Sequence, residues 1–319
     1  MKLNTERIHT IWHLTWPQCI MLLCQFVIGI TDVWAGGRIG SEVQASIGLI
    51  TQCHMMFMAL AMAAVNGAVA SISQSLGACK FVRARRYVGL VTIGCIAVGS
   101  AIAVAASVWR EPLLRLIQTP ESIMPVAIMF LTATIWGIPG QYTLTIGAAV
   151  FRSAKMVLIP LYVTGTACLL NVFGDLAFGL GWWGFPAYGA AGLAYSTLIS
   201  VTVGAALMLF LLMRHGLFTR DSFPGWRWIK AGAPYLLKVA GPAFGTSFLW
   251  QTGYMVLYVI TASLPFGRVN ALAGLTTGLR VESILFLPAV AFSMTASVLV
   301  GHALGEGNRR EAKRTLLAT

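Results

Sequence analysis

Three acidic residues lie inside stretches of the chain that are otherwise apolar: Asp32, Asp175 and Glu282. The other seven of the ten Asp and Glu residues fall at the ends of such stretches or between them. A carboxylate at membrane depth is costly unless it is paired, hydrated or protonated, so each of the three marks a candidate functional site. Burial favours the neutral acid, and a second carboxylate nearby favours it further. Such a group can take up a proton on one side of a membrane and release it on the other.

The residues around these acids suggest how they could work. Asn171 and Asp175 are four residues apart, which places an amide and a carboxyl group on one face of a helix. Pro17 precedes Asp32 in the same apolar stretch and permits a kink, so we expect a hinge there that couples protonation to helix shape. Arg280 and Glu282 are two residues apart and do not face each other on a helix, so helix packing and a functional role are both open for Glu282.

Other polar residues in the apolar stretches have ordinary structural interpretations. Gln25 and Thr197 are of types that more often form interhelical hydrogen bonds than bind a ligand. His54 and His302 have no second metal-ligating residue nearby, and the six cysteines form no CxxC pair. We therefore expect no metal site, no disulfide framework and no cofactor, and the ion that the buried carboxylates would take up is H+ or Na+.

The composition predicts an all-α integral membrane protein, since 57% of residues are hydrophobic and 10% are charged. Apolar runs long enough to cross a bilayer recur along the whole chain. Eight such spans are predicted, at roughly 11–35, 46–76, 87–109, 123–149, 157–180, 188–213, 239–263 and 272–304.

The net charge of +12 is distributed as membrane topology requires, not as a nucleic-acid surface. Seventeen Lys and Arg residues lie in the N-terminal segment, in the loops after the second, fourth and sixth spans, and in the tail; Arg152 and Lys155 are counted in the loop after the fourth span. The opposite side has only Arg38, Arg110, Arg115 and Arg268. This asymmetry predicts a multi-pass protein of the inner (plasma) membrane with its N-terminus in the cytoplasm and no nucleic-acid partner.

An internal repeat divides the chain. "SISQSLGACKFVRARR" (71–86) corresponds to "LVGHALGEGNRREAKR" (299–314) at an offset of 228 residues, and Pro17 corresponds to Pro242 at an offset of 225. Six spans separate the copies, so both cross the membrane in the same direction, as in parallel repeats. We expect a six-helix bundle at 1–214, a basic cytoplasmic linker at 215–238, and the first two helices of a second bundle at 239–319. Four further helices would complete the second copy, so the sequence reads as a fragment, a truncated product or a chain completed by another.

Four segments in order resemble the multidrug and toxic-compound extrusion (MATE) family, and its DinF-like branch in particular. They are "WPQCIMLLCQFVIGITDVWAGGRIG", "SISQSLGACKFVRARR", "LLNVFGDLAFGLGWWGFPAYGAAGLAYST" and "TTGLRVESILFLPAVAFSMTASVLVGHALGEGN". The resemblance implies a twelve-helix antiporter of two bundles, with Asp32, Asn171, Asp175 and Thr197 in one hydrogen-bonded cluster. Gln25, Arg280 and Glu282 would serve a substrate site or a site in the second bundle. Trp250 and Gln251 occupy the region where several sodium-coupled members carry an acid.

The function that follows is export of amphipathic or cationic organic compounds in exchange for protons. There is no P-loop to bind ATP and no HExxH or similar constellation, so an ion gradient is the expected driving force and an enzyme is not expected. Alternatives are sodium coupling through the same carboxylates, a flippase for lipid-linked precursors, and a truncated remnant that does not transport. The expected partners are small organic substrates and the lipid bilayer, and a full-length chain is expected to be a monomer.

Overall fold

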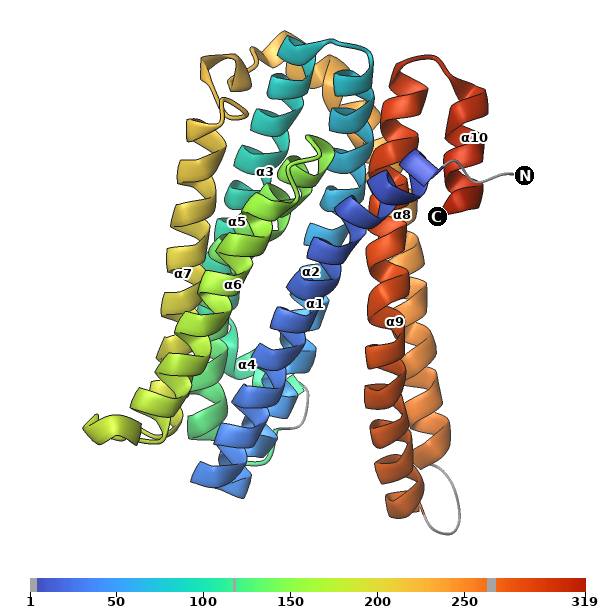
Figure 1. The fold of residues 1–319 in the computed structure, drawn as a ribbon. Coiled ribbons are helices and arrows are strands. Elements are labelled where there is room, and N and C mark those ends of the chain that lie inside the picture. The colour runs from blue at the N-terminus through green and yellow to red at the C-terminus, as the bar shows by residue number, and fades with distance from the viewer. Residues whose placement is uncertain (1–4, 117–118, 263–267) are drawn as a thin grey trace.

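The fold is taken from a computed structural model, which describes residues 5–116, 119–262 and 268–319, except for the side chains at 5, 251, 255, 258–259, 262, 268–281 and 283–284. The described residues form helices joined by short connections (Figure 1). The elements are α1 (Thr5–Ile39), α2 (Ser41–Gly77), α3 (Phe81–Val108), α4 (Arg110–Leu116), α5 (Met124–Ser153), α6 (Leu158–Gly174), the π-helical turn η1 (Asp175–Gly179), the 3-10 turn η2 (Trp182–Gly184), α7 (Ala190–Arg214), the 3-10 turn η3 (Arg220–Ser222), α8 (Trp226–Ala262), α9 (Arg268–Gly305) and α10 (Arg309–Ala318).

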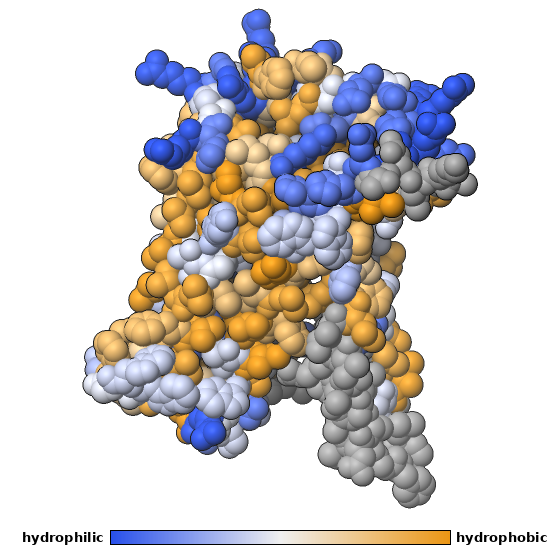
Figure 2. Space-filling view, in the orientation of Figure 1, coloured by the Kyte–Doolittle hydropathy of each residue, from blue (hydrophilic) through white to orange (hydrophobic). Residues whose placement is uncertain are grey.

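Seven of the described helices are long and apolar enough to cross a membrane, which agrees with the all-α membrane class. They are α1, α2, α3, α5, α6 with η1, α7, and the part of α9 over Leu285–Gly305. The predicted span at 239–263 lies in α8, which falls outside this set because Gly, Thr, Ser and Gln interrupt its apolar residues. Figure 2 shows apolar side chains around the middle of the molecule and hydrophilic ones gathered at the end where α10 lies.

The first six long helices form a bundle, and α8 and α9 stand beside it as an antiparallel pair (Figure 1). This pair contacts the bundle mainly through α2, and α9 also contacts α1. Both chain ends lie at the same end of the molecule, where Arg7 of α1 forms an ion pair of 2.8 Å with Glu311 of α10. The connections after α2, α5 and α7 lie at this end too. The turn η3 and the first turns of α8, which begins at Trp226, fall within 215–238. Helices therefore occupy much of the stretch that was expected to be a linker.

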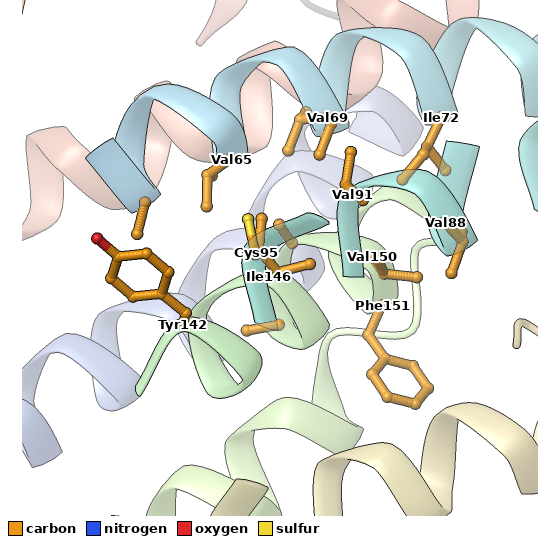
Figure 3. Close-up of a cluster of buried hydrophobic side chains, with 14 of the residues drawn as sticks. Val65, Val69, Ile72, Val88, Val91, Cys95, Tyr142, Ile146, Val150 and Phe151 are labelled. Atoms are coloured by element: carbon orange, nitrogen blue, oxygen red, sulfur yellow. The ribbon is translucent and has the colours of Figure 1, made fainter. Parts of the chain in front are cut away.

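Helix α5 lies at the centre of the bundle, because it packs against α2, α3 and α7. Figure 3 shows side chains from α2, α3 and α5 packed together: Val65, Val69, Ile72, Val88, Val91, Cys95, Tyr142, Ile146, Val150 and Phe151. These side chains are at most 7% exposed. Packed apolar side chains of this kind hold the backbone of α5 in place, and the remaining face of α5 is free to line a cavity.

The two sequence repeats meet where α2 crosses α9. A β-carbon at Gly77 would lie 2.2 Å from the carbonyl oxygen of His302, and one at Gly305 would lie 2.3 Å from the carbonyl oxygen of Gln74. The offset of 228 residues relates Gly77 to Gly305 and also Gln74 to His302, so the two contacts are equivalent under the repeat. Only glycine permits backbones this close. The repeated Leu-Gly pairs therefore allow a very close approach between the backbones of the two halves.

Candidate functional site

Asp175 lies where the winding of its helix changes. Helix α6 ends at Gly174, and Asp175 begins the π-helical turn η1, in which the Leu180 N–H donates to the Asp175 carbonyl oxygen over 3.1 Å. Such turns are rare and are frequent at functional sites. The Tyr188 N–H donates to the Phe178 carbonyl oxygen over 2.8 Å, which fastens the connection before α7 to this turn.

Glycines let α7 approach this turn closely. A β-carbon at Gly192 of α7 would lie 2.3 Å from the Phe178 carbonyl oxygen, and one at Gly174 would lie 2.5 Å from the β-carbon of Ser196. The close approach brings the Ser196 hydroxyl to Asp175, where it donates a hydrogen bond to Oδ1. Small residues in these two segments therefore set the position of the acid's hydrogen-bond donor.

The structure brings Asp32, Asn171, Asp175 and Thr197 together from α1, α6, η1 and α7. Asn171 and Asp175 have no exposed surface. The Asn171 Nδ2 donates to Thr197 Oγ1 over 3.1 Å. The carboxyl group of Asp32 lies near the side chains of Asp175 and Asn171.

Three buried oxygens in this cluster have no hydrogen-bond donor among the described residues: Asp32 Oδ1, Asp175 Oδ2 and Asn171 Oδ1. A buried polar atom without a partner is costly, so each such atom needs an explanation. A cluster of acceptors that lacks donors is suited to receive a cation. A proton held between the two carboxyl groups would supply one of them with an O–H donor.

The cluster forms part of the wall of a cavity of about 370 Å³. Asp32, Asn171 and Thr197 line this cavity, and so does Gln25, whereas Asp175 lies behind the wall. Residues of α1, α2, α5, α6 and α7 and Met294 of α9 complete the lining, which is mostly apolar. The volume lies within the range of about 300–1,000 Å³ that is typical of sites for small organic molecules.

The remaining predicted site residues lie elsewhere. Glu282 accepts a hydrogen bond of 3.1 Å from the Tyr254 hydroxyl, between α9 and α8, and does not line the cavity. Arg280 is in α9, and its side chain is outside the described residues. Pro17 is buried within α1, next to Gln18, whose Nε2 donates to Thr295 Oγ1 of α9 over 2.9 Å. The predicted hinge therefore lies beside a polar contact between the two halves.

Sequence reasoning missed several residues of the cavity and its acid pair. Ser196 is one, since its neighbour Thr197 was the residue singled out. His54 lines the cavity, whereas His302 contacts the Ser153 carbonyl oxygen through Nε2 over 2.8 Å. The structure also corrects the prediction that Arg152 belongs to the loop after the fourth span. Arg152 lies in the last turn of α5, is 7% exposed and lines the cavity. Hydropathy locates the end of a span but does not show which way a side chain there points.

The MatE family model matches residues 17–176 and 242–319. The two matches begin 225 residues apart, at Pro17 and Pro242, which is the offset of the repeat. The family model therefore finds the same duplication as the sequence comparison.

Curated relatives include the "Probable multidrug resistance protein NorM" of Thermotoga maritima, which is 27% identical over 294 residues covering 89% of this chain and 61% of the relative. The "FAD transporter" of Shewanella oneidensis is 23% identical over 304 residues, covering 94% of this chain and 66% of the relative. The chain thus spans somewhat less than two thirds of the length of these relatives.

Solved structures have the same fold. The Vibrio cholerae MATE transporter VcmN superposes with a TM-score of 0.88 at 21% identity, covering 98% of this chain and 69% of that one. A MOP superfamily transporter from Pyrococcus furiosus superposes with a TM-score of 0.87 at 20% identity, covering 97% of this chain and 67% of that one. From the family match over most of its length, and from the membrane-helical fold it shares with these structures, the chain belongs to the MatE family.

Proposed function

We propose that this protein is a secondary antiporter of the inner membrane that exports amphipathic, often cationic, organic compounds in exchange for protons. MatE family members are secondary transporters and not enzymes. Relatives are named as multidrug resistance proteins, which supports small organic molecules as the exported class.

The observation that carries the proposal is the pair of facing carboxyl groups, Asp32 and Asp175, each with a buried oxygen that has no donor. Two adjacent carboxylates in an apolar surrounding do not both stay charged, so the pair favours holding one proton. Asp32 lines the cavity, so a ligand there would compete with the proton for the same oxygens. Competition of this kind is what an exchanger requires.

We also propose that the N-terminus lies on the cytoplasmic side of the membrane. The N-terminus, the C-terminus and the basic connections share one end of the molecule (Figure 1), and a positive excess marks the cytoplasmic side of a membrane protein.

Reconstituted liposomes would test the proposal. The purified chain is placed in vesicles, the membrane potential is clamped, sodium is omitted and a pH gradient is imposed. Movement of a fluorescent organic cation against the proton flow is expected, and it should be lost in Asp32→Asn. Asp221→Asn is the control, because Asp221 is an exposed acid paired with Arg85 at 3.3 Å, outside the cavity. Equal dye movement in Asp32→Asn and the unmodified protein would rule out coupling through this pair.

Sodium is the second candidate for the coupling ion, and one observation favours it. A single proton between the acids leaves Asn171 Oδ1 still without a partner, whereas a hard cation prefers several oxygen ligands at once. The same vesicles with a sodium gradient at equal pH on both sides separate the two ions. Dye movement that follows the sodium gradient would assign the site to sodium.

A further inference from the structure

Arg152 is a buried cation without a partner among the described residues. It is 7% exposed, and its Nε is buried with no hydrogen-bond acceptor. The ion pairs formed by the described residues are Arg7–Glu311 and Arg85–Asp221, so no carboxylate compensates this guanidinium. An arginine side chain stays protonated in proteins, and a buried charge is costly unless something pairs with it.

The side chain lies on the cavity rather than in a packed core. Thr134, Gln141, Thr145 and Arg152 all line the cavity from α5, spaced by seven, four and seven residues, which places them on one face of the helix. Arg152 lies next to the contact of Ser153 with His302 of α9, near the end of the molecule that holds both termini. The row of polar residues that α5 presents to the cavity therefore ends in a fixed positive charge.

The acid of the cavity lies far from this charge. Helix α1 lines the cavity from Gln18 to Asp32, which corresponds to about 21 Å of helix. Asp32 is seven residues before the end of α1, and α1 and α5, whose last turn holds Arg152, end at opposite ends of the bundle (Figure 1). Among the described residues no ion pair joins the two charges, and the lining of the cavity is mainly apolar.

We propose that Arg152 binds an anionic group, a carboxylate or a phosphate, of an amphipathic molecule whose apolar part fills the cavity. The guanidinium presents a fork of N–H donors that matches the two oxygens of such a group, and bonds of this kind are among the stronger ones in proteins. The proposal rests on the proposed function in that the ligand is a transported molecule. It adds to the exported cations a class of compounds that carry an anionic group, such as zwitterions whose cationic part would face Asp32.

Equilibrium binding in detergent solution tests the site without any ion gradient. The probes are a fluorescent xanthene dye with a free carboxylate and the methyl ester of the same dye, followed by fluorescence polarisation. The acid is expected to bind at least about tenfold more tightly than the ester, as charge-assisted hydrogen bonds to a buried group imply. Arg152→Gln should abolish this preference, whereas Arg152→Lys should keep part of it. The same ratio of acid to ester affinity in Arg152→Gln and in the unmodified protein would overturn the proposal.

Thermal unfolding separates a ligand site from a structural role. Arg152→Met removes an uncompensated charge, so the midpoint in the absence of dye should stay the same or rise. A fall of several degrees would mean that Arg152 has a structural partner and would contradict the proposal. Competition of the acid dye by phosphatidylglycerol but not by phosphatidylcholine would identify a lipid headgroup as the source of the anionic group, and no competition would identify a soluble molecule. Because no gradient is used, loss of proton coupling in vesicles would leave this result intact.

Discussion

The contact between Gly77 and the backbone of α9 allows a quantitative prediction. A β-carbon at Gly77 would lie 2.2 Å from the His302 carbonyl oxygen, whereas ordinary contact begins at 3.4 Å. Gly77→Ala therefore requires α2 and α9 to separate by about 1.2 Å at this crossing. Overpacking of this kind costs about 1–3 kcal/mol. Alanine regains about 1 kcal/mol as the better helix former, so a net loss of up to about 2 kcal/mol is expected.

The assay is thermal unfolding in detergent, with Gly94→Ala as the matched control. Gly94 lies within α3, and a β-carbon there would have no atom within 4 Å. The same substitution should therefore stabilise the protein by about 0.5–1 kcal/mol at Gly94 and destabilise it at Gly77. Equal effects at the two positions would refute the reasoning.

The repeat adds a second part to this prediction. Gly305→Ala places a β-carbon 2.3 Å from the Gln74 carbonyl oxygen and should cost about as much as Gly77→Ala. A single separation of α2 from α9 relieves both clashes, so the double variant should lose less stability than the sum of the two single variants. Strict additivity would show that the two contacts are independent.

Two further predictions concern hydrogen bonds. Ser196→Ala removes the donor to Asp175 Oδ1 and should lower the free energy of unfolding by about 1–3 kcal/mol, which thermal unfolding measures. Ser200→Ala is the control, because the Ser200 hydroxyl bonds only to the Thr197 carbonyl oxygen of its own helix. Thr295→Val removes the acceptor for Thr15 and Gln18, both at 2.9 Å, and should cost about 1–2 kcal/mol. Ser297→Ala, on an exposed residue bonded within α9, should be nearly neutral, and an equal loss in both variants would contradict a role for the contact between the halves.

Hydropathy predicted the membrane helices well because bilayer thickness fixes their length. The span expected at 46–76 is α2 (Ser41–Gly77), and the repeat was visible because the crossing needs glycine in both copies. The grouping of Asp32 with Asn171 and Asp175 came from the family resemblance, since spacing alone relates only residues on one helix.

Features that depend on contacts between helices could not be predicted from the sequence. Composition gives no sign of the π-helical turn at Asp175, which forms where α7 packs closely against it. Ser196 and Thr197 are adjacent, and only the rotation of α7 decides which hydroxyl meets the acid. The charge of Arg152 suggested a loop, yet its side chain turns inward at the end of the central helix.

The π-helical turn at Asp175 gives the helix formed by α6 and η1 one residue more than an α-helical turn would hold. Rewinding the turn as an α-helix would rotate Leu180 and the residues after it by about 100° around the helix axis, while α6 kept its place. The hydrogen bond from Tyr188 to Phe178 ties the connection before α7 to the same turn. A change in the winding at Asp175 would therefore reach the connection before α7 through the backbone, without displacement of any whole helix.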